Sequence, residues 1–536
     1  MMMDHPLLVK TMLERANNLF PKKEIFSRCL DQDFRYTYRD FYKRTHKMGN
    51  VLQNLGIKKG DKIGTFAWNN HRHLELYFSI ICSGAVLHTL NLRLFPEHLV
   101  HVINHAEDKV IFIDEDLIPI LEKAADQLTT VEKYVILTDK KELPETKLEP
   151  AYSYEALLEE ASDSFEFPDD LDEKAPAAMC YTTATTGLPK GVVYTQRSIY
   201  LHSLVLSLKD VIGISESDSI LPVVPMFHVM AWGVPFAATW LGAKLVMPGR
   251  VLTPDALCKL IEQEKVTFSA GVPTIWMGIY QHLEAGNKYD FSSLRFFVNG
   301  GSAISKNLIE AFEKKHGINI LHAYGMTETS PLVLASQLKS YMEDWDEDTK
   351  YSLLAKQGLL VPGLDMKIVN DEGKEVAWDG KEMGELCVRG PWIAGEYYKE
   401  PERSKESMKD GWLHTNDIVT IDEEGYILIQ DRAKDLIKSG GEWISSVDLE
   451  NTIMAHPAVA EAAVVAIPDE KWVERPMACI VLKPEEKGKV TDQEIMDFLE
   501  DKVAKWWLPD KIIFLDEIPK TSVGKFNKKA LRENYA

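Results

Sequence analysis

Residues 181–191 read Tyr-Thr-Thr-Ala-Thr-Thr-Gly-Leu-Pro-Lys-Gly. The threonine hydroxyls and the backbone N–H groups, which glycine makes flexible, are neutral hydrogen-bond donors, and the lysine is a cation. Such a set suits the oxygens of a polyphosphate. The segment is not a Walker A loop, because Pro189 precedes the lysine and Gly191 follows it where Ser or Thr would hold magnesium. Taken alone, the segment is also compatible with a Thr-rich surface turn after a buried strand.

Around this segment, apolar runs of strand length alternate with stretches of helical period. Strands are expected at 62–67, 110–114, 244–247 and 268–271, and helices at 37–55, 74–83, 255–264 and 306–316. Such alternation predicts an α/β protein whose mostly parallel sheets carry helices on both faces.

The composition of the sequence changes after about Leu359, where glycine and charged turn residues become frequent. Short expected strands follow one another at 367–369, 385–389, 418–421 and 426–430, which indicates a β-rich subdomain. Helix and strand patterns then resume over roughly a hundred residues, enough for a separate small α+β domain. We therefore predict a large N-terminal domain at 1–431 and a C-terminal domain at 435–536, joined at 431–434.

Composition and charge exclude several classes of protein. A net charge of −21 argues against a nucleic-acid partner and against binding to anionic lipid, so an anionic ligand must be held by local basic residues and backbone N–H groups. The six cysteines form no CxxC pair, which suits a reducing cytosol. Neither a signal peptide nor an apolar run of the ~20 residues that a membrane span needs is found. The expected location is cytoplasmic, without stable membrane insertion.

Four further segments carry chemistry-bearing side chains, although each alone is weak. Residues 324–328, Tyr-Gly-Met-Thr-Glu, offer an aromatic face for a base and a carboxylate for a metal. Residues 415–417, Thr-Asn-Asp, place a carboxylate where ribose hydroxyls can bind, although Asn-Asp is also common in turns. Residues 431–443 and 521–525 are basic, glycine-containing segments that are individually typical of solvated loops.

In this order, the five segments resemble those of the adenylate-forming superfamily of acyl-CoA synthetases, luciferases and peptide-synthetase adenylation domains. Residues 225–232, Pro-Met-Phe-His-Val-Met-Ala-Trp, and 438–445, Lys-Ser-Gly-Gly-Glu-Trp-Ile-Ser, are most similar to bacterial and archaeal fatty-acyl-CoA synthetases. The resemblance spans nearly the full chain. It implies a medium- or long-chain fatty acid–CoA ligase, which converts acid and ATP to acyl-AMP and pyrophosphate, and then acyl-AMP and coenzyme A to acyl-CoA and AMP.

The resemblance also implies a nucleotide site, position by position. The ATP phosphates are expected at Thr182, Thr183, Thr185, Thr186, Gly187 and Lys190. Mg²⁺ is expected between Thr182, Glu328 and the phosphates. The adenine is expected against Tyr324, near Gly301, Ser302, His322 and Ala323, and the ribose at Asp417 and Arg432.

Catalysis is expected to use Lys525 on the α-phosphate and the attacking carboxylate, together with Thr327 and Glu328 at the phosphates. The small domain, mobile in this family, is then expected to rotate about Lys434, which withdraws Lys525 and brings in Lys438. If residues 228–232 form a helix, His228 and Trp232 share a face. The acid and the pantetheine are expected at His228, Val229, Trp232, Ala303, Gly441 and Trp443, with Trp232 either the gate of an acyl tunnel or a core residue.

The sequence departs from the family pattern at three positions. Ala184 replaces a usual glycine of the phosphate loop, Asn416 replaces the glycine of the ribose motif, and Ala323 replaces a common glycine at the floor of the acyl pocket. Where the backbone needs positive φ, alanine costs roughly 1 kcal/mol relative to glycine, whereas asparagine is tolerated better.

Three other functions remain open on the sequence alone. The chain is also compatible with a stand-alone adenylation domain that loads a carrier protein, with a luciferase-like oxidase, and with a low-activity nucleotide-binding relative. The lysines at 438 and 525 argue against the last, because a binding module needs no catalytic lysine. Relatives of this kind are often homodimers through the large domain, so a homodimer is expected by analogy.

Overall fold

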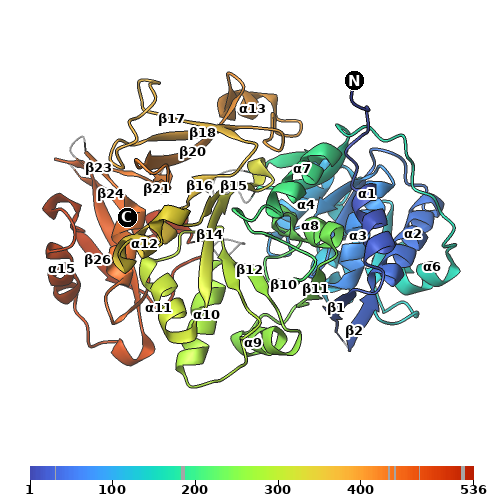
Figure 1. The fold of residues 1–536 in the computed structure, drawn as a ribbon, viewed down its shortest axis with the longest axis horizontal. Helices are drawn as coiled ribbons and strands as arrows, with labels where there is room; N and C mark the ends of the chain where they lie inside the picture. The colour runs from blue at the N-terminus through green and yellow to red at the C-terminus, as the bar shows by residue number, and fades with distance from the viewer. Residues whose placement is uncertain are drawn as a thin grey trace.

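A computed structural model describes residues 1–30, 32–182, 188–432, 435–439, 442–469, 471–520 and 526–535, with the backbone alone at 442 and 443. Over these residues the chain forms a large N-terminal part, a β-rich subdomain and a C-terminal part, which run from blue through orange to red in Figure 1. The four sheets described below provide the framework of all three parts.

A seven-stranded sheet lies at the N-terminal end of the molecule, in the order β7-β6-β5-β3-β4-β8-β9. Its strands are β3 (Lys62–Phe66), β4 (Val86–Thr89), β5 (Asp108–Asp114), β6 (Lys133–Leu137), β7 (Ala151–Ser153), β8 (Pro176–Tyr181) and β9 (Gly191–Thr195). All pair in parallel except β8 and β9, which are antiparallel. The associated helices are α2 (Tyr38–Asn54), α3 (His71–Cys82), α4 (Pro96–Ala106), α5 (Ile118–Glu122) and α6 (Tyr154–Glu160).

A nine-stranded sheet follows, in the order β16-β15-β14-β13-β12-β10-β11-β1-β2. Its strands are β1 (Glu24–Arg28), β2 (Asp33–Thr37), β10 (Ser219–Pro222), β11 (Lys244–Met247), β12 (Phe268–Gly271), β13 (Phe296–Asn299), β14 (Asn319–Gly325), β15 (Leu332–Ser336) and β16 (Leu359–Leu360). The central pairs are parallel and the two edges are antiparallel. The helices of this region are α1 (Lys10–Leu19), α7 (Gln196–Leu206), α8 (Val234–Leu241), α9 (Pro254–Gln263), α10 (Pro273–Glu284), α11 (Lys306–His316) and α12 (Glu347–Ala355).

Helix α3 shows how the two large sheets are joined. Every one of its residues is buried, and a helix that is covered all round must lie inside a core. Its side chains share one hydrophobic core with Ile63 of β3 and Leu245 of β11, one residue from each sheet. Helices therefore fill the space between two mostly parallel sheets, as the alternating pattern predicts.

The predicted helix at 37–55 is confirmed as α2, and its ends have local causes. Thr37 and Asp40 form a capping box in which each side chain bonds the backbone N–H of the other, and this satisfies N–H groups that lack a helical partner. The chain leaves the helix before Gly56, whose φ of 84° is left-handed and therefore favours glycine.

The β-rich subdomain is an antiparallel sheet in the order β17-β18-β20-β19, with β21 also paired to β20. It comprises β17 (Asp365–Val369), β18 (Gly384–Arg389), β19 (Met408–Lys409), β20 (Trp412–Ile421), β21 (Ile427–Arg432) and the helix α13 (Pro401–Ser407). This antiparallel sheet confirms the β-rich subdomain predicted after residue 359. Its strand β20 carries Asp417, and its strand β18 carries Glu385.

The C-terminal part has a sheet of its own in the order β23-β22-β25-β24, with β26 parallel to β25. Its elements are β22 (Ile437–Ser439), β23 (Glu442–Ile444), α14 (Ser446–Met454), β24 (Val459–Asp469), β25 (Val473–Leu482), α15 (Asp492–Glu500), β26 (Lys511–Phe514) and α16 (Lys528–Tyr535). Two hydrophobic cores are built from its residues alone.

None of the described helices in the whole chain combines the length and the apolar character needed to cross a membrane.

Short 3₁₀ turns connect several of these elements. They are η1 (Glu115–Leu117), η2 (Ala125–Gln127), η3 (Val229–Gly233), η4 (Thr327–Thr329), η5 (Ser340–Met342), η6 (Pro484–Glu486) and η7 (Lys505–Trp507). Two of them, η3 and η4, contain residues of the candidate site.

Candidate active site

The Thr-rich segment joins the antiparallel strands β8 and β9, so it begins and ends at one edge of the seven-stranded sheet. At its base the N–H of Thr182 donates to the carbonyl of Lys190 at 2.9 Å, and the N–H of Lys190 donates to Oγ1 of Thr182 at 3.1 Å. Thr182 also lines a small cavity together with His228. The predictions for Thr183, Thr185, Thr186 and Gly187, and the departure at Ala184, lie outside the described residues.

Lys190 and Glu328 are connected through a tyrosine that the sequence analysis missed. The ammonium of Lys190 lies 3.8 Å from the ring centroid of Tyr397, and the Tyr397 hydroxyl donates to Oε1 of Glu328 at 2.7 Å. Burial lowers the pKa of Lys190, and the positive charges of Arg403 and Arg432 act in the same direction. The site therefore gathers basic groups on a protein of net charge −21, as an anionic ligand requires.

Asp417 of β20 lies between Tyr324 of β14 and Arg432 of β21. Its Oδ2 accepts from the Tyr324 hydroxyl at 2.5 Å, and its Oδ1 lies 3.0 Å from Nε of Arg432. The Asp417 carboxylate is only 4% exposed, whereas the Arg432 side chain is 45% exposed. The Asp417 charge raises the pKa of Arg432 further above its usual value. Three residues predicted to hold the nucleoside thus meet in space.

The part of β20 that carries Asp417 contains a left-handed residue. Asn416 has a φ of 58°, a conformation in which asparagine is tolerated better than most residues. The Asn416 N–H donates to Oε1 of Glu385 at 2.9 Å, and the Asp417 N–H donates to Oγ1 of Thr415 at 3.1 Å. Asn416, which replaces the usual glycine of the ribose motif, thus stands at a position of positive φ.

The residues predicted to surround the adenine lie after β13 and along β14. Gly301 has a φ of 80°, and Ser302 and Ala303 next to it are exposed. The His322 side chain is buried and donates from Nδ1 to the carbonyl of Ala355 at 3.0 Å, so its ring is engaged within the protein. The carbonyl of the buried Thr327 in η4 accepts from the Tyr194 hydroxyl at 2.8 Å.

Residues 228–232 do not form a right-handed helix, so the condition under which His228 and Trp232 would share a helical face is not met. His228 is extended, and Val229, Met230, Ala231 and Trp232 have φ between 37° and 57°, so η3 is a left-handed turn. The relation between residues i and i+4 of an α-helix does not apply there. Helical spacing of apolar residues does not report the hand of the backbone, and the sequence pattern therefore could not reveal this turn.

The left-handed turn brings the indole of Trp232 against the strand ends of the nine-stranded sheet. A Cβ added at Gly300 would lie 3.0 Å from Cη2 of Trp232 and 3.3 Å from the carbonyl oxygen of Ala323. Trp232 is half-buried and packs against the main hydrophobic core. Its ring therefore covers Gly300, close to the residue predicted to form the floor of the acyl pocket.

The C-terminal part contributes one described site residue. Lys438 on β22 is exposed, and its backbone N–H donates to Oε2 of Glu474 at 2.8 Å. The predictions at Lys434, Gly441 and Lys525 lie outside the described residues, as does the side chain of Trp443.

Comparison with known proteins adds independent evidence. The sequence model for the AMP-binding enzyme family matches residues 13–398, and that for the AMP-binding enzyme C-terminal domain matches residues 448–525. The chain is 47% identical to a long-chain-fatty-acid–CoA ligase of Thermus thermophilus, with 100% of this chain and 96% of the relative covered. It is 41% identical to a 3-methylmercaptopropionyl-CoA ligase of Ruegeria lacuscaerulensis (100% and 98% covered) and 40% identical to a medium-chain-fatty-acid–CoA ligase of Ectopseudomonas oleovorans (100% and 97%).

A solved structure has the same architecture over the whole chain. The anthranilate CoA ligase AuaEII, crystallised with anthranoyl-AMP, superposes with a TM-score of 0.88 at 26% identity, and the match covers 99% of this chain and 98% of that one. Fold and sequence together place the chain in a defined class: it belongs to the family of AMP-binding enzymes. Within that class, its full-length relatives named above are acid–CoA ligases.

Proposed function

We propose that the chain is an ATP-dependent acyl-CoA synthetase that activates a medium- or long-chain fatty acid. The observation that carries this proposal is the buried Asp417 between Tyr324 and Arg432. One buried carboxylate can accept from both ribose hydroxyls, and the tyrosine beside it offers a face for the adenine. Identity of 47% and 40% with ligases of long- and medium-chain fatty acids supports the choice of acid.

In the first half-reaction the acid carboxylate attacks the α-phosphorus of ATP. The bond from that phosphorus to the bridging oxygen breaks, and pyrophosphate leaves with the bonding electrons. The protein contributes mainly by positioning and by stabilising the negative charge that develops on the phosphoryl oxygens. We assign these roles to Lys190, to Thr327 and, from the resemblance, to Lys525, with the remaining hydroxyls of the Thr-rich segment on the outer phosphates.

A magnesium ion fits the side chains proposed to hold it. Glu328 is only 5% exposed and offers carboxylate oxygens, and Thr182 adds a hydroxyl, so both supply the oxygen donors that Mg²⁺ prefers. When bound, the ion would neutralise phosphate charge. The hydrogen bond from Tyr397 orients the Glu328 carboxylate before any ligand binds.

In the second half-reaction the thiolate of coenzyme A attacks the acyl carbonyl, and AMP leaves. We propose domains at 1–431 and 435–536, with rotation about Lys434 that exchanges Lys525 for Lys438. Supporting this division, β21 ends at Arg432, and the C-terminal part contains hydrophobic cores of its own. Gly441 and Trp443 are proposed to line the pantetheine path.

The acid is proposed to enter beside His228 and Val229 and to displace Trp232 from Gly300. In this structure the indole covers Gly300, so an acyl chain directed there needs the ring to move. We propose that bound ATP favours the displaced position of the ring. Coupling of this kind requires that ATP bind the two positions with different affinity.

Replacing Trp232 with alanine should therefore uncouple acid binding from ATP. The dissociation constant of a non-hydrolysable palmitate analogue, measured by calorimetry with and without a non-hydrolysable ATP analogue, should differ at least tenfold in the wild type, a coupling of about 1.4 kcal/mol. In Trp232→Ala the ratio should approach one. Trp240→Ala, which removes an aromatic ring packed at a tilt against Tyr200, should retain the wild-type ratio. An unchanged ratio in Trp232→Ala would show that this indole is packing only.

The reaction and the acid are tested together by pyrophosphate release with Mg-ATP and coenzyme A. The acids should run from acetate to palmitate, with benzoate and 3-methylthiopropionate added, and Lys525→Ala should serve as control. We expect activity that peaks on an unbranched fatty chain and is lost in the control. Release that does not depend on coenzyme A would favour carrier loading or a luciferase-like oxidation, and no release with any acid would favour a nucleotide-binding relative.

We further propose that the enzyme works in the cytoplasm as a homodimer. The six cysteines are all free thiols, as a reducing compartment requires. The dimer rests on the family resemblance alone, and light scattering coupled to size-exclusion chromatography tests it directly: a mass near 60.8 kDa, rather than twice that value, would refute it.

A further inference from the structure

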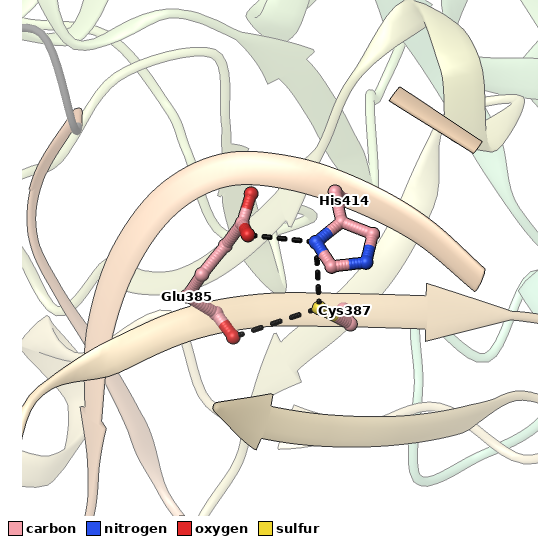
Figure 2. A group of neighbouring side chains, drawn as sticks. All are labelled: Glu385, Cys387 and His414. Carbon is pink, nitrogen blue, oxygen red and sulfur yellow. Dashed lines mark hydrogen bonds and ion pairs between the residues drawn. The ribbon is translucent and has the colours of Figure 1, made fainter. Parts of the chain in front are cut away.

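Glu385, Cys387 and His414 form a compact group on the β-rich subdomain, outside the residues assigned to substrates (Figure 2). Nδ1 of His414 lies 2.7 Å from Oε2 of Glu385 and 3.4 Å from Sγ of Cys387. Across the part of the chain that the structure describes, this is the single group of three histidine, cysteine or carboxylate side chains whose ligand atoms all lie within 4.8 Å of one another.

The sheet register explains why these three side chains meet. Cys387 on β18 and His414 on β20 are direct cross-strand partners, so their side chains project from the same face. Glu385 precedes Cys387 by two residues on the same strand, and the register with β20 shifts between them, so that Glu385 pairs with Ile418. The group therefore lies at a register shift between two paired strands, with backbone pairing on both sides of it.

We propose that Glu385, Cys387 and His414 bind one divalent transition-metal ion of the zinc class, with water as a fourth ligand. A thiolate, an imidazole and a carboxylate form a set typical of zinc and cobalt, whereas magnesium prefers oxygen ligands alone. The site is thus chemically distinct from the proposed Mg²⁺ position at Thr182 and Glu328.

The spacing of the ligand atoms fits a tetrahedral ion with little movement. Zn–S and Zn–N bonds of about 2.3 and 2.05 Å place sulfur and nitrogen roughly 3.5 Å apart, and Sγ and Nδ1 are 3.4 Å apart here. Nitrogen and carboxylate oxygen need roughly 3.4 Å between them, so Oε2 of Glu385 must move about 0.7 Å from its present 2.7 Å contact with Nδ1. A glutamate side chain accommodates this movement by rotation about its own bonds.

Binding must also balance protons. The Cys387 thiol loses its proton to solvent as the metal–sulfur bond forms, and His414 must give up the Nδ1 proton that it donates to Oε2 of Glu385 and keep a proton on Nε2 to bind through Nδ1. The carboxylate of Glu385 binds the ion through Oε2. Its other oxygen, Oε1, accepts from the N–H of Asn416 at 2.9 Å, so the bound ion would link β18 to the residue that precedes Asp417.

Cobalt titration of the full-length, chelator-treated protein tests this proposal without any activity assay. Co²⁺ in a tetrahedral site with a thiolate ligand gives a thiolate-to-cobalt charge-transfer band and intense visible bands. We expect these bands to saturate at one equivalent, to disappear on addition of Zn²⁺, and to be lost in Cys387→Ala and in His414→Gln. Because no ATP or acid is present, the outcome is independent of the proposed function.

Cys29 supplies a matched control. Its Sγ lies 3.5 Å from Nδ1 of His71, so it is also a thiol beside an imidazole, but it belongs to no such three-residue group. Cys29→Ala should keep the bands. Bands that persist in Cys387→Ala, that are lost in Cys29→Ala, or that fail to appear in the wild type would overturn the proposal. Thermal unfolding of each metal-free variant shows whether that variant folds. If Cys387→Ala fails to fold, His414→Gln alone tests the proposal, because His414 is partly exposed whereas Cys387 is buried.

Discussion

Replacing Glu328 with glutamine is expected to lower acid-dependent pyrophosphate release by about 100- to 1,000-fold, the loss typical for one preorganised charge at a reacting phosphate. Glutamine keeps the size of the side chain, and its carbonyl oxygen can still accept from Tyr397, so packing should survive. Only the negative charge proposed to hold Mg²⁺ is removed. The measurement is kcat/KM for ATP at several Mg²⁺ concentrations, and the deficit should shrink as Mg²⁺ rises.

Tyr397→Phe is the matched control for this substitution. It removes the hydroxyl that donates to Glu328 but leaves the carboxylate and the aromatic face under Lys190. One hydrogen bond to a charged group contributes about 1.5–3 kcal/mol, and part of it will be replaced by water, so a loss of about tenfold is expected. If Glu328→Gln costs no more than Tyr397→Phe, Glu328 orients its neighbours and does not hold the metal.

The substitution Asp417→Asn should weaken ATP binding by about 100-fold. Two hydrogen bonds from ribose to a carboxylate, at about 1.5–3 kcal/mol each, would be exchanged for weaker ones to an amide, and a net loss of about 3 kcal/mol corresponds to that factor. Arg432 would also lose its ion-pair partner at 3.0 Å. The dissociation constant of ATP, measured by calorimetry without acid, isolates this effect from the chemistry.

An exposed pair in the same subdomain provides the control for Asp417. Asp365 lies 2.9 Å from Nε of Arg389, with side chains 64% and 53% exposed, so it repeats the pairing of carboxylate and guanidinium away from the site. Exposed pairs of this kind contribute little, and Asp365→Asn should leave ATP affinity unchanged. Equal effects of the two substitutions would mean that Asp417 acts through the stability of the sheet rather than through contact with the nucleotide.

Much of the framework could be predicted because its causes are local. The helix at 306–316 and the strand at 244–247 follow from apolar period and length, and the structure places both at those residues. Tyr324, Asp417 and Arg432 were expected at one nucleoside, although they come from three different strands, because the order of the motifs resembles a known family. Pattern alone would not have brought them together.

The remainder depended on contacts between distant residues. Tyr397 lies outside every motif, and its role becomes visible only when its hydroxyl is found on Glu328, a residue 69 positions away. Likewise Glu385, Cys387 and His414 meet where the register between β18 and β20 shifts. A sequence without a structure shows neither the pairing nor the register.

The left-handed turn at Val229–Trp232 has a consequence for the balance of free energy around the candidate site. Each non-glycine residue in that conformation costs about 1–2 kcal/mol, so four in succession cost roughly 4–8 kcal/mol. The contacts that surround the turn must offset this cost, because the folded chain keeps the conformation. The position of the indole on Gly300 is therefore set by its neighbours rather than by the local preference of the backbone.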